Sequence, residues 1–156
     1  MKIYKRVLIM GILCAILSAC GNYENEDSSQ NNYPWNIGIE NEFVMGEDVE
    51  ITMDLIEESL SATAASFTLK NEGVEEASYG SRYCLQIRIN KTWYQIEQYA
   101  DWTLEAYRLA SGAKETISVN WENLYGSLPV GEYRFVKEFT IEDETIYLAC
   151  PFVIED

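Results

Sequence analysis

Cys20 is the residue whose chemistry is most clearly marked by its neighbours. It closes the segment Leu17-Ser18-Ala19-Cys20, in which small residues precede the thiol. Three cationic side chains lie in the first six residues, and an apolar run follows them. This order is typical of a bacterial secretory signal, and its ending resembles a lipobox. We therefore predict that residues 1–19 are a lipoprotein signal peptide and that Cys20 carries a diacylglycerol thioether.

The same segment has two other interpretations. The apolar run from Val7 to Ala19 is shorter than the roughly 20 residues that a spanning helix needs, so a spanning helix is disfavoured. An ordinary signal peptide that happens to contain a cysteine is the remaining alternative interpretation. With lipidation, attachment to the membrane would come from acyl chains such as palmitate, because two or more chains anchor a protein stably. We expect an extracytoplasmic protein, lipid-anchored to the cell membrane.

The charge of the chain excludes two classes of partner. There are 11 Lys+Arg and 26 Asp+Glu residues, a formal charge of −15. Removal of residues 1–19 would delete Lys2, Lys5 and Arg6 and no acid, leaving 8 bases, 26 acids and a charge of −18. Phosphate binding needs a basic face, so nucleic acid is excluded. Electrostatic adhesion to anionic lipid is excluded as well.

Residues suited to catalysis are scarce. The chain has no histidine, which removes Ser-His-Asp and Cys-His catalysis and the commonest zinc ligand. Clustered carboxylates can hydrolyse glycosides or bind calcium when they converge in space, but solvated turns are the favoured interpretation. We predict no enzyme, no metal site and no cofactor. The acidic clusters are Glu57-Glu58, Glu75-Glu76 and Glu142-Asp143-Glu144.

These features divide the chain into three parts. Residues 20–41 contain the lipidated cysteine and a polar stretch typical of a flexible tether, in which Tyr33-Pro34-Trp35 either docks or continues the tether. Residues 42–156 are long enough for one domain. Short runs of alternating apolar and polar residues predict an antiparallel sandwich or barrel. The clearest runs are 49–55, 83–89, 93–96, 117–121, 133–139 and 146–154.

Two segments rich in Glu, Leu and Ala compete for helix, at 55–65 and 100–110. For the first we predict a loop that leads into a strand, and for the second mainly strand. Residues 121–126 predict one helical turn that ends at Gly126.

The segment Leu128-Pro129-Val130-Gly131-Glu132-Tyr133 predicts a structural site. Pro129 and Gly131 set a turn, and Tyr133 opens the next strand. We expect Tyr133 to be buried, with its hydroxyl bonded to upstream backbone near Leu128 to Val130 as a tyrosine corner, a feature of immunoglobulin-like sandwiches.

The wider pattern resembles the bacterial immunoglobulin-like domains found in small lipoproteins. The match runs through Thr92-Trp93-Tyr94, residues 121–126 and residues 128–139, and it covers roughly residues 49–154. It departs from the family at Lys91-Thr92, where a glycine is frequent. The resemblance implies an antiparallel immunoglobulin-like β-sandwich of about seven to eight strands, no catalytic residues, and a Gram-positive surface as the favoured location.

Cys84 and Cys150 are predicted to stay unpaired, although two cysteines in an exported domain often form a disulfide. Cys84 lies opposite the apolar face that Tyr83 and Leu85 share, whereas Cys150 has the parity of Phe152 and points into the core. In an immunoglobulin-like strand order their strands flank the tyrosine-corner strand, about 9.6 Å apart. A disulfide tolerates roughly 7 Å between Cα atoms.

The aromatic residues leave two functions open. Trp93 and Trp121 are predicted in the core, and Trp35 and Trp102 are the candidates for exposure, where they could stack on a ligand. The first function is a surface module that binds a protein or acts as a spacer. The second is a ligand-binding lipoprotein that captures a cell-wall glycan or a cation. A concave aromatic groove would favour the second function, and flat faces would favour the first.

Overall fold

A computed structural model describes residues 33–40, 43, 45–46, 49–98 and 101–156. These residues belong to one contact unit, Asn32–Asp156. The predicted signal peptide, Cys20 and the first part of the predicted tether lie outside the described residues. No helix within the described residues is long and apolar enough to cross a membrane.

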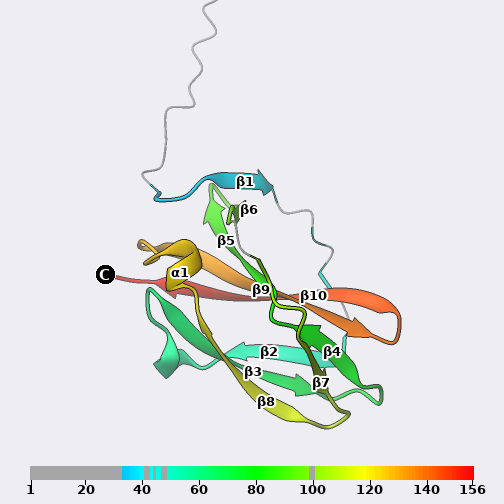
Figure 1. The fold of residues 1–156 in the computed structure, drawn as a ribbon. Helices are drawn as coiled ribbons and strands as arrows, with labels where there is room; N and C mark the ends of the chain where they lie inside the picture. The colour runs from blue at the N-terminus through cyan, green and yellow to red at the C-terminus, as the bar shows by residue number, and fades with distance from the viewer. Residues whose placement is uncertain (1–32, 41–42, 44, 47–48, 99–100) are drawn as a thin grey trace, which may run out of the picture. The chain divides into compact units, whose positions relative to one another are not determined.

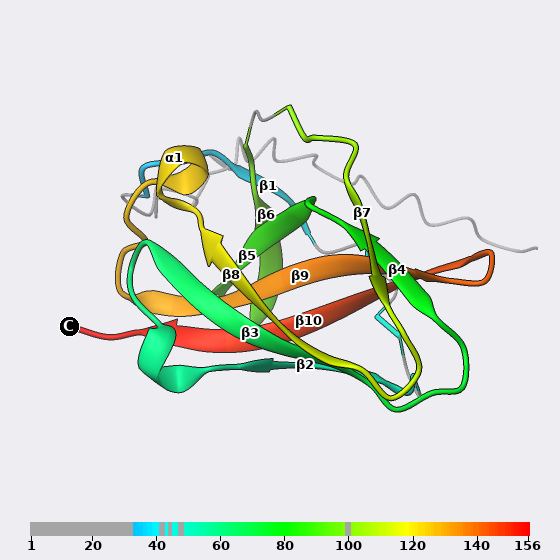
Figure 2. The same ribbon diagram turned by 60° about the horizontal axis from the view of Figure 1, so that its bottom comes forward.

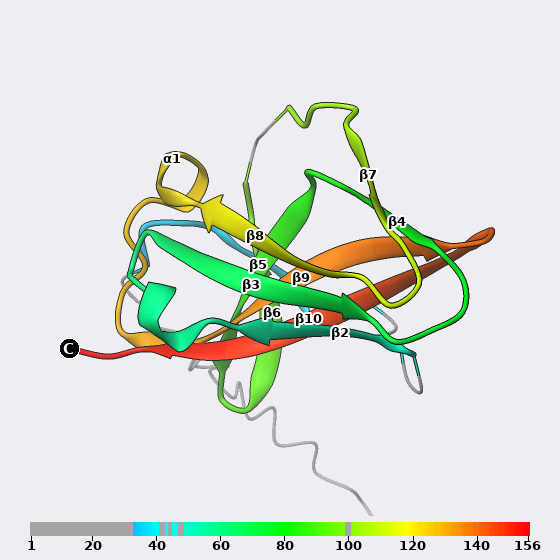
Figure 3. The same ribbon diagram turned by 90° about the horizontal axis from the view of Figure 1, so that it is seen from below.

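Two antiparallel sheets contain ten strands in the described part of the chain (Figures 1 and 2). The larger sheet has the order β1-β6-β5-β9-β4-β7, and β10 pairs with the other edge of β9. The smaller sheet, of order β2-β3-β8, crosses in front of β9 and β10 in Figure 3. The predicted antiparallel sandwich is confirmed. The strands are β1 (Ile37–Glu40), β2 (Ile51–Leu55), β3 (Ala64–Asn71), β4 (Ala77–Gly80), β5 (Tyr83–Ile89), β6 (Thr92–Ile96), β7 (Ala106–Leu109), β8 (Lys114–Asn120), β9 (Gly131–Ile141) and β10 (Glu144–Ile154).

Strand β9 holds most of the larger sheet together. All 11 of its residues pair with β10. On its other edge, residues 133–137 pair with β5 and residues 140–141 pair with β4. β9 is therefore a central strand with a partner along both edges.

The strand beside β9 is broken between β4 and β5. Ser78 lies opposite Thr140, but Tyr83 lies opposite Lys137, so the register with β9 shifts by two residues across the break. Beyond it, β4 pairs with β7 while β5 pairs with β6. The sheet consequently forks at this irregularity, as sheets do where a bulge bends a strand.

The folded unit begins before the boundary that the sequence predicts at residue 42, which is a correction. β1 pairs antiparallel with β6. Trp35 stacks on Tyr33 with ring centroids 5.5 Å apart, and its Nε1 donates to the carbonyl of Tyr125. The polar composition of this segment indicates a tether, but three apolar anchors (Tyr33, Trp35 and Ile37) pack against the core.

The two segments whose composition also suits a helix form little helix. Residues 55–65 contain the short 3₁₀ helix η1 (Glu57–Ser59) and then lead into β3, as predicted. Only β7 forms in the segment 100–110, which is less strand than predicted, and residues 99–100 lie outside the described residues.

Two turns follow from local backbone conformation. The helical turn α1 (Glu122–Tyr125) ends at Gly126, which has φ 71°, so the predicted stop at a glycine is confirmed. The β5–β6 hairpin turns through Asn90 and Lys91 with φ of 50° and 71°. Positive φ at both turn residues is the type I′ conformation that suits two-residue hairpins, and this chain forms it without glycine.

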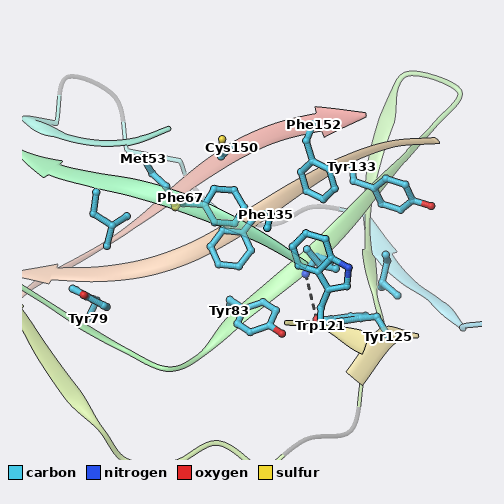
Figure 4. Close-up of a cluster of buried hydrophobic side chains, with 14 of the residues drawn as sticks. Met53, Phe67, Tyr79, Tyr83, Trp121, Tyr125, Tyr133, Phe135, Cys150 and Phe152 are labelled. Atoms are coloured by element: carbon cyan, nitrogen blue, oxygen red, sulfur yellow. Dashed lines mark hydrogen bonds between the residues drawn. The ribbon is translucent and has the colours of Figure 1, made fainter. Parts of the chain in front are cut away.

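The core between the sheets is largely aromatic (Figure 4). Phe67 of β3 and Phe135 of β9 stack across the interface with ring centroids 4.3 Å apart. Trp121, just before α1, is fully buried and stacks on Phe152 of β10 at 5.5 Å. The prediction that Trp121 belongs to the core is confirmed. Offset aromatic pairs of this kind add to the stabilisation from buried area.

Tyr133 forms the corner where the chain enters β9. Its side chain is fully buried, and its hydroxyl donates to the carbonyl of Pro129 at 2.9 Å. Gly131 lies under the ring, because a Cβ there would be 3.3 Å from Cε2 of Tyr133. The buried Leu128 donates its N–H to the carbonyl of Ala62 at 2.8 Å, which fixes the start of the turn. This is the geometry expected of a tyrosine corner.

The Tyr133→Phe variant should lower the free energy of unfolding by about 0.5–1.5 kcal/mol, the net value of one hydrogen bond. The ring packing against Trp35 and Phe152 would remain. Tyr107→Phe is the matched control, since its hydroxyl donates to Glu105 at an exposed position, where changes stay within about 0.5 kcal/mol. Urea denaturation of both variants checks this. Equal midpoints for Tyr133→Phe and the wild type would contradict it.

Candidate functional site

Strands β7 and β8 diverge from their shared turn (Figures 2 and 3). Residues of β4, β5, β7 and β8 line a groove in this region. Its volume is about 600 Å³, which is in the range of ligand-binding clefts. One wall consists of residues 116–120 of β8. The rings on the other side come from β4, β5, β7 and the loop before β7; they are Tyr79, Tyr83, Trp102 and Tyr107.

These rings form two pairs. Tyr79 and Tyr107 stack with centroids 5.3 Å apart, and Trp102 meets Tyr83 edge-on at 5.0 Å. Tyr107 is 45% exposed, and Leu104 in the preceding loop is fully exposed. Trp102 is half-buried by its ring contact, so its predicted exposure is only partial; Trp35 is half-buried in the same way. The groove therefore presents apolar surface at its mouth.

A lysine lies on the core face of β9 at the floor of this groove. Lys137 has the parity of the core residues Phe135 and Phe139, and it is only 3% exposed. Its Nζ donates to the carbonyl oxygens of Gly80 at 2.7 Å and Arg82 at 3.3 Å. These carbonyls lie at the break between β4 and β5. The ammonium thus donates hydrogen bonds to two carbonyl oxygens that the fork removes from the β-sheet ladder.

Burial lowers the pKa of Lys137 to about 8, and the attraction of Glu138 opposes this to a smaller extent. The ammonium also lies 5.1 Å from the centre of the Tyr79 ring, a cation–π contact. Because a buried cation is unfavourable without compensation, the two carbonyls and the ring together explain how the charge is tolerated.

Two carboxylates accept hydrogen bonds from tyrosines that line the groove. Tyr79 donates its hydroxyl to Oε2 of Glu115 at 2.9 Å, and Tyr107 donates to Oε2 of Glu105 at 2.7 Å. Within the described residues, no three His, Cys, Asp or Glu side chains gather closely enough to hold a metal ion. Of the three acidic clusters, Glu57-Glu58 lies in η1. Glu75-Glu76 precedes β4, and Glu142-Asp143-Glu144 follows β9 at the end where Ala77 of β4 pairs with Ile141 of β9.

Cys84 and Cys150 are buried free thiols. Cys84 lies opposite Val136, and Cys150 lies opposite Phe135, so they sit on the two edges of β9 and face opposite sides of the sheet. Burial raises the pKa of Cys84 to about 11 and shifts the pKa of Cys150 in the same direction. Since the thiolate is the nucleophile, neither cysteine is suited to catalysis at neutral pH.

The outer face of the larger sheet carries a second cluster, and here one prediction is wrong. The sequence predicts Trp93 in the core, but the guanidinium carbons of Arg134 and Arg88 lie 4.6 and 5.7 Å from its ring centre. Arg88 pairs across the sheet with Trp93 and forms an ion pair with Glu132 at 2.9 Å. Tyr94 faces the core in place of Trp93, because the hairpin register reverses the expected parity.

The sandwich, the tyrosine corner and the helical turn before it define an immunoglobulin-like architecture. The sequence matches the family described as Bacterial Ig-like domain over residues 46–151. The chain belongs to this family.

Two solved structures are similar to the chain. The crystal structure of the putative ApaA protein from Bordetella pertussis is 15% identical, with a TM-score of 0.41, over 78% of this chain and 94% of that one. The X-ray structure of the structural genomics target SoR45 is 17% identical, with a TM-score of 0.36, over 67% of this chain and 81% of that one. No curated protein matches the chain.

The groove is not predicted by the sequence. Its rings come from segments that are far apart in the chain, and only the fork brings Tyr79 and Tyr107 together. Lys137 did carry a signal, because it shares its parity with the aromatic residues Tyr133, Phe135 and Phe139 of the same strand. A lysine at that position predicts a buried polar contact.

Lys137 should give the protein a distinctive dependence on pH. Its folded pKa of about 8 lies below the ordinary value of 10.5, so between these values the unfolded chain binds more protons at this residue. The lysine therefore makes the free energy of unfolding rise with pH across that window. We would measure the free energy of unfolding against pH for the wild type and for Lys137→Met. The difference between the two curves isolates this rise, because the other groups titrate in both proteins. The exposed Lys114→Met is the control, and its curve should run parallel to the wild type. A flat difference for Lys137→Met would contradict the assignment.

Proposed function

We propose that this chain is a non-catalytic immunoglobulin-like module, anchored outside the cell membrane through lipid on Cys20, that acts by binding a partner. The observation that carries the binding role is the groove between β7 and β8, where aromatic rings and one edge of a sheet face the same open space. Aromatic side chains of this kind are enriched where proteins bind partners.

The chemistry of the described residues supports binding over catalysis. The two thiols have raised pKa values, and the ammonium of Lys137 is held by two carbonyls. An open aromatic groove fits recognition better than bond cleavage, because catalysis needs an activated nucleophile or acid–base pair.

The proposed location rests on sequence features and family. Bacterial Ig-like domains are usually extracellular or surface-exposed. The basic and apolar start of the chain and the Leu17-Ser18-Ala19-Cys20 ending support export and lipidation. The family resemblance favours a Gram-positive surface.

Substitution of Cys20 tests the anchor. Cys20→Ala should leave an unlipidated precursor, because the sulfur that accepts the diacylglycerol is gone. Cys14→Ala is the matched control, since it removes a thiol from the same segment without touching the lipid site. Intact-mass analysis of membrane fractions should find acyl chains on the wild type and the control alone. A wild-type membrane form without acyl chains would refute the anchor.

A second candidate is capture of a cell-wall glycan in the same groove. The stacked Tyr79–Tyr107 pair and the half-buried Trp102 favour it, because sugars stack on aromatic faces. Soluble cell-wall saccharides that bind the wild-type chain but not Trp102→Ala would favour this candidate over a protein partner.

A further inference from the structure

Strand β8 has a free edge without the usual protection. It ends the order of the smaller sheet, and in the described part of the chain it pairs only with β3, in an unbroken register from Asn120 opposite Ala64 to Lys114 opposite Lys70. Exposed edges are normally short, covered, or blocked by proline, bulges or charge, because they template pairing with other chains. From Thr116 to Asn120, β8 has no charge and no proline.

The other terminal strands in the described residues are protected. β1 and β7 have only four residues each. β10 contains Pro151, and the outward carbonyl of Tyr147 is already bonded by the N–H of Gly46 at 3.0 Å. β2 lies along β10 (Figures 2 and 3). β8 is therefore the exception among the terminal strands described.

The hydrogen bonds with β3 show which groups of β8 point outward. Trp121 donates its N–H to the carbonyl of Thr63 at 2.9 Å, and Ala113 accepts from the N–H of Asn71 at 3.0 Å. Both bonds cross the same ladder at odd-numbered positions of this segment. Residues alternate between bonding and non-bonding positions in an antiparallel pair, so the N–H and C=O groups of the even-numbered residues point away from β3. These residues are Thr116, Ser118 and Asn120.

The outward groups of β8 face the aromatic groove. Five consecutive residues, 116–120, line it. Alternate side chains of a strand point to opposite faces, so a hollow lined by all five must run along the edge of the strand and not over one face. The far wall carries the stacked Tyr79 and Tyr107. The turn between β7 and β8 is held to β3 by Asn71, whose Nδ2 donates to the carbonyl of Leu109 at 3.0 Å.

We propose that the groove binds an extended peptide segment of a partner protein, which adds a strand to the edge of β8. In this mode main-chain hydrogen bonds provide affinity, and pockets for alternate side chains provide specificity. Apolar side chains of the segment would cover the rings of Tyr79 and Tyr107. The proposal rests on the binding role proposed above and names its site and class of partner.

The groove and its charge determine the kind of segment. Both walls of the groove belong to this chain, so a linear segment fits the space better than the edge of a folded domain does. Glu105 and Glu115 accept hydrogen bonds from the groove tyrosines. Among the described residues, the only cation that lines the groove is the ammonium of Lys137, which is already hydrogen-bonded. The segment is therefore basic at its flanks, in agreement with the formal charge of −15.

Selection from a library of random linear peptides tests the proposal. The full chain in detergent serves as the target. We expect peptides with alternating apolar residues and basic flanks. Ser118→Pro removes an outward N–H and leaves the bonds to β3, a position where proline is tolerated in edge strands. It should weaken binding by about tenfold or more, because the bound strand loses a main-chain hydrogen bond and meets the proline ring.

Ser118→Ala is the matched control. It loses the hydroxyl contact with Ser66 (2.9 Å) just as proline does, but it keeps the N–H. The affinity of Ser118→Ala for the selected peptides should stay within about threefold of that of the wild type, because most surface substitutions have small effects. Circular dichroism and melting verify that both variants fold. Hydrogen exchange supplies a second readout: the peptide should protect the amides of residues 116, 118 and 120, whereas those of 117 and 119 are protected in the free chain as well.

Five outcomes would overturn the proposal. The first two are selected peptides that bind the wild type and Ser118→Pro equally, and selected peptides that leave the outward amides unprotected. A dimer that Ser118→Pro dissociates would assign the edge to a second copy of this chain. Cell-wall saccharides that compete for the groove while no peptide binds would assign it to a glycan. If the membrane-bound chain captures a partner protein equally well with Ser118→Pro, the binding role stands and the groove assignment fails.

Discussion

The structure depends on one strand, β9, which pairs with other strands along both edges and packs into the core on one face. β9 pairs with β10 along one edge and with β5 and β4 along the other. Its core face supplies Tyr133, Phe135 and Phe139, all fully buried. Tyr133 fixes where the strand starts, through its bond to Pro129. The strand therefore sets both the register of the larger sheet and the position of the aromatic core against Phe67 of the smaller sheet.

The same strand explains the groove. A broken neighbour leaves two carbonyls, of Gly80 and Arg82, for which Lys137 provides the donors. A buried ammonium is unfavourable in an apolar core, but here it stabilises a fork that directs β4 and β7 away from β5 and β6. The aromatic side chains of the fork then face the edge of β8 across open space. Packing in the centre of the sandwich thus determines where it can bind.

The fold could be predicted from the sequence to the extent that local pattern controls it. Alternation in residues 83–89 and 133–139 predicts strands that the structure contains, and the turn into Tyr133 and the stop at Gly126 follow from residue type. The predictions fail where distant packing decides. The Asn-rich composition around Trp35 conceals a docked strand, and the register of the β5–β6 hairpin places Trp93 between two arginines instead of in the core. β4 and β7 are short strands that pair with each other, and β4 also pairs with β9. The groove brings residues of β4, β5, β7, β8 and β9 together, so no single segment could indicate it.

Native-state hydrogen exchange in increasing denaturant tests most directly whether β9 is the strand on which the rest depends. Elements with few partners open locally, whereas the most protected amides exchange only by global unfolding. We predict that the amides of residues 133–139 exchange last, with a free energy and denaturant dependence equal to those of global unfolding, while β1 and β7 exchange earlier through local opening. Exchange of the β9 amides at a lower free energy than those of β3 would contradict the central position of this strand.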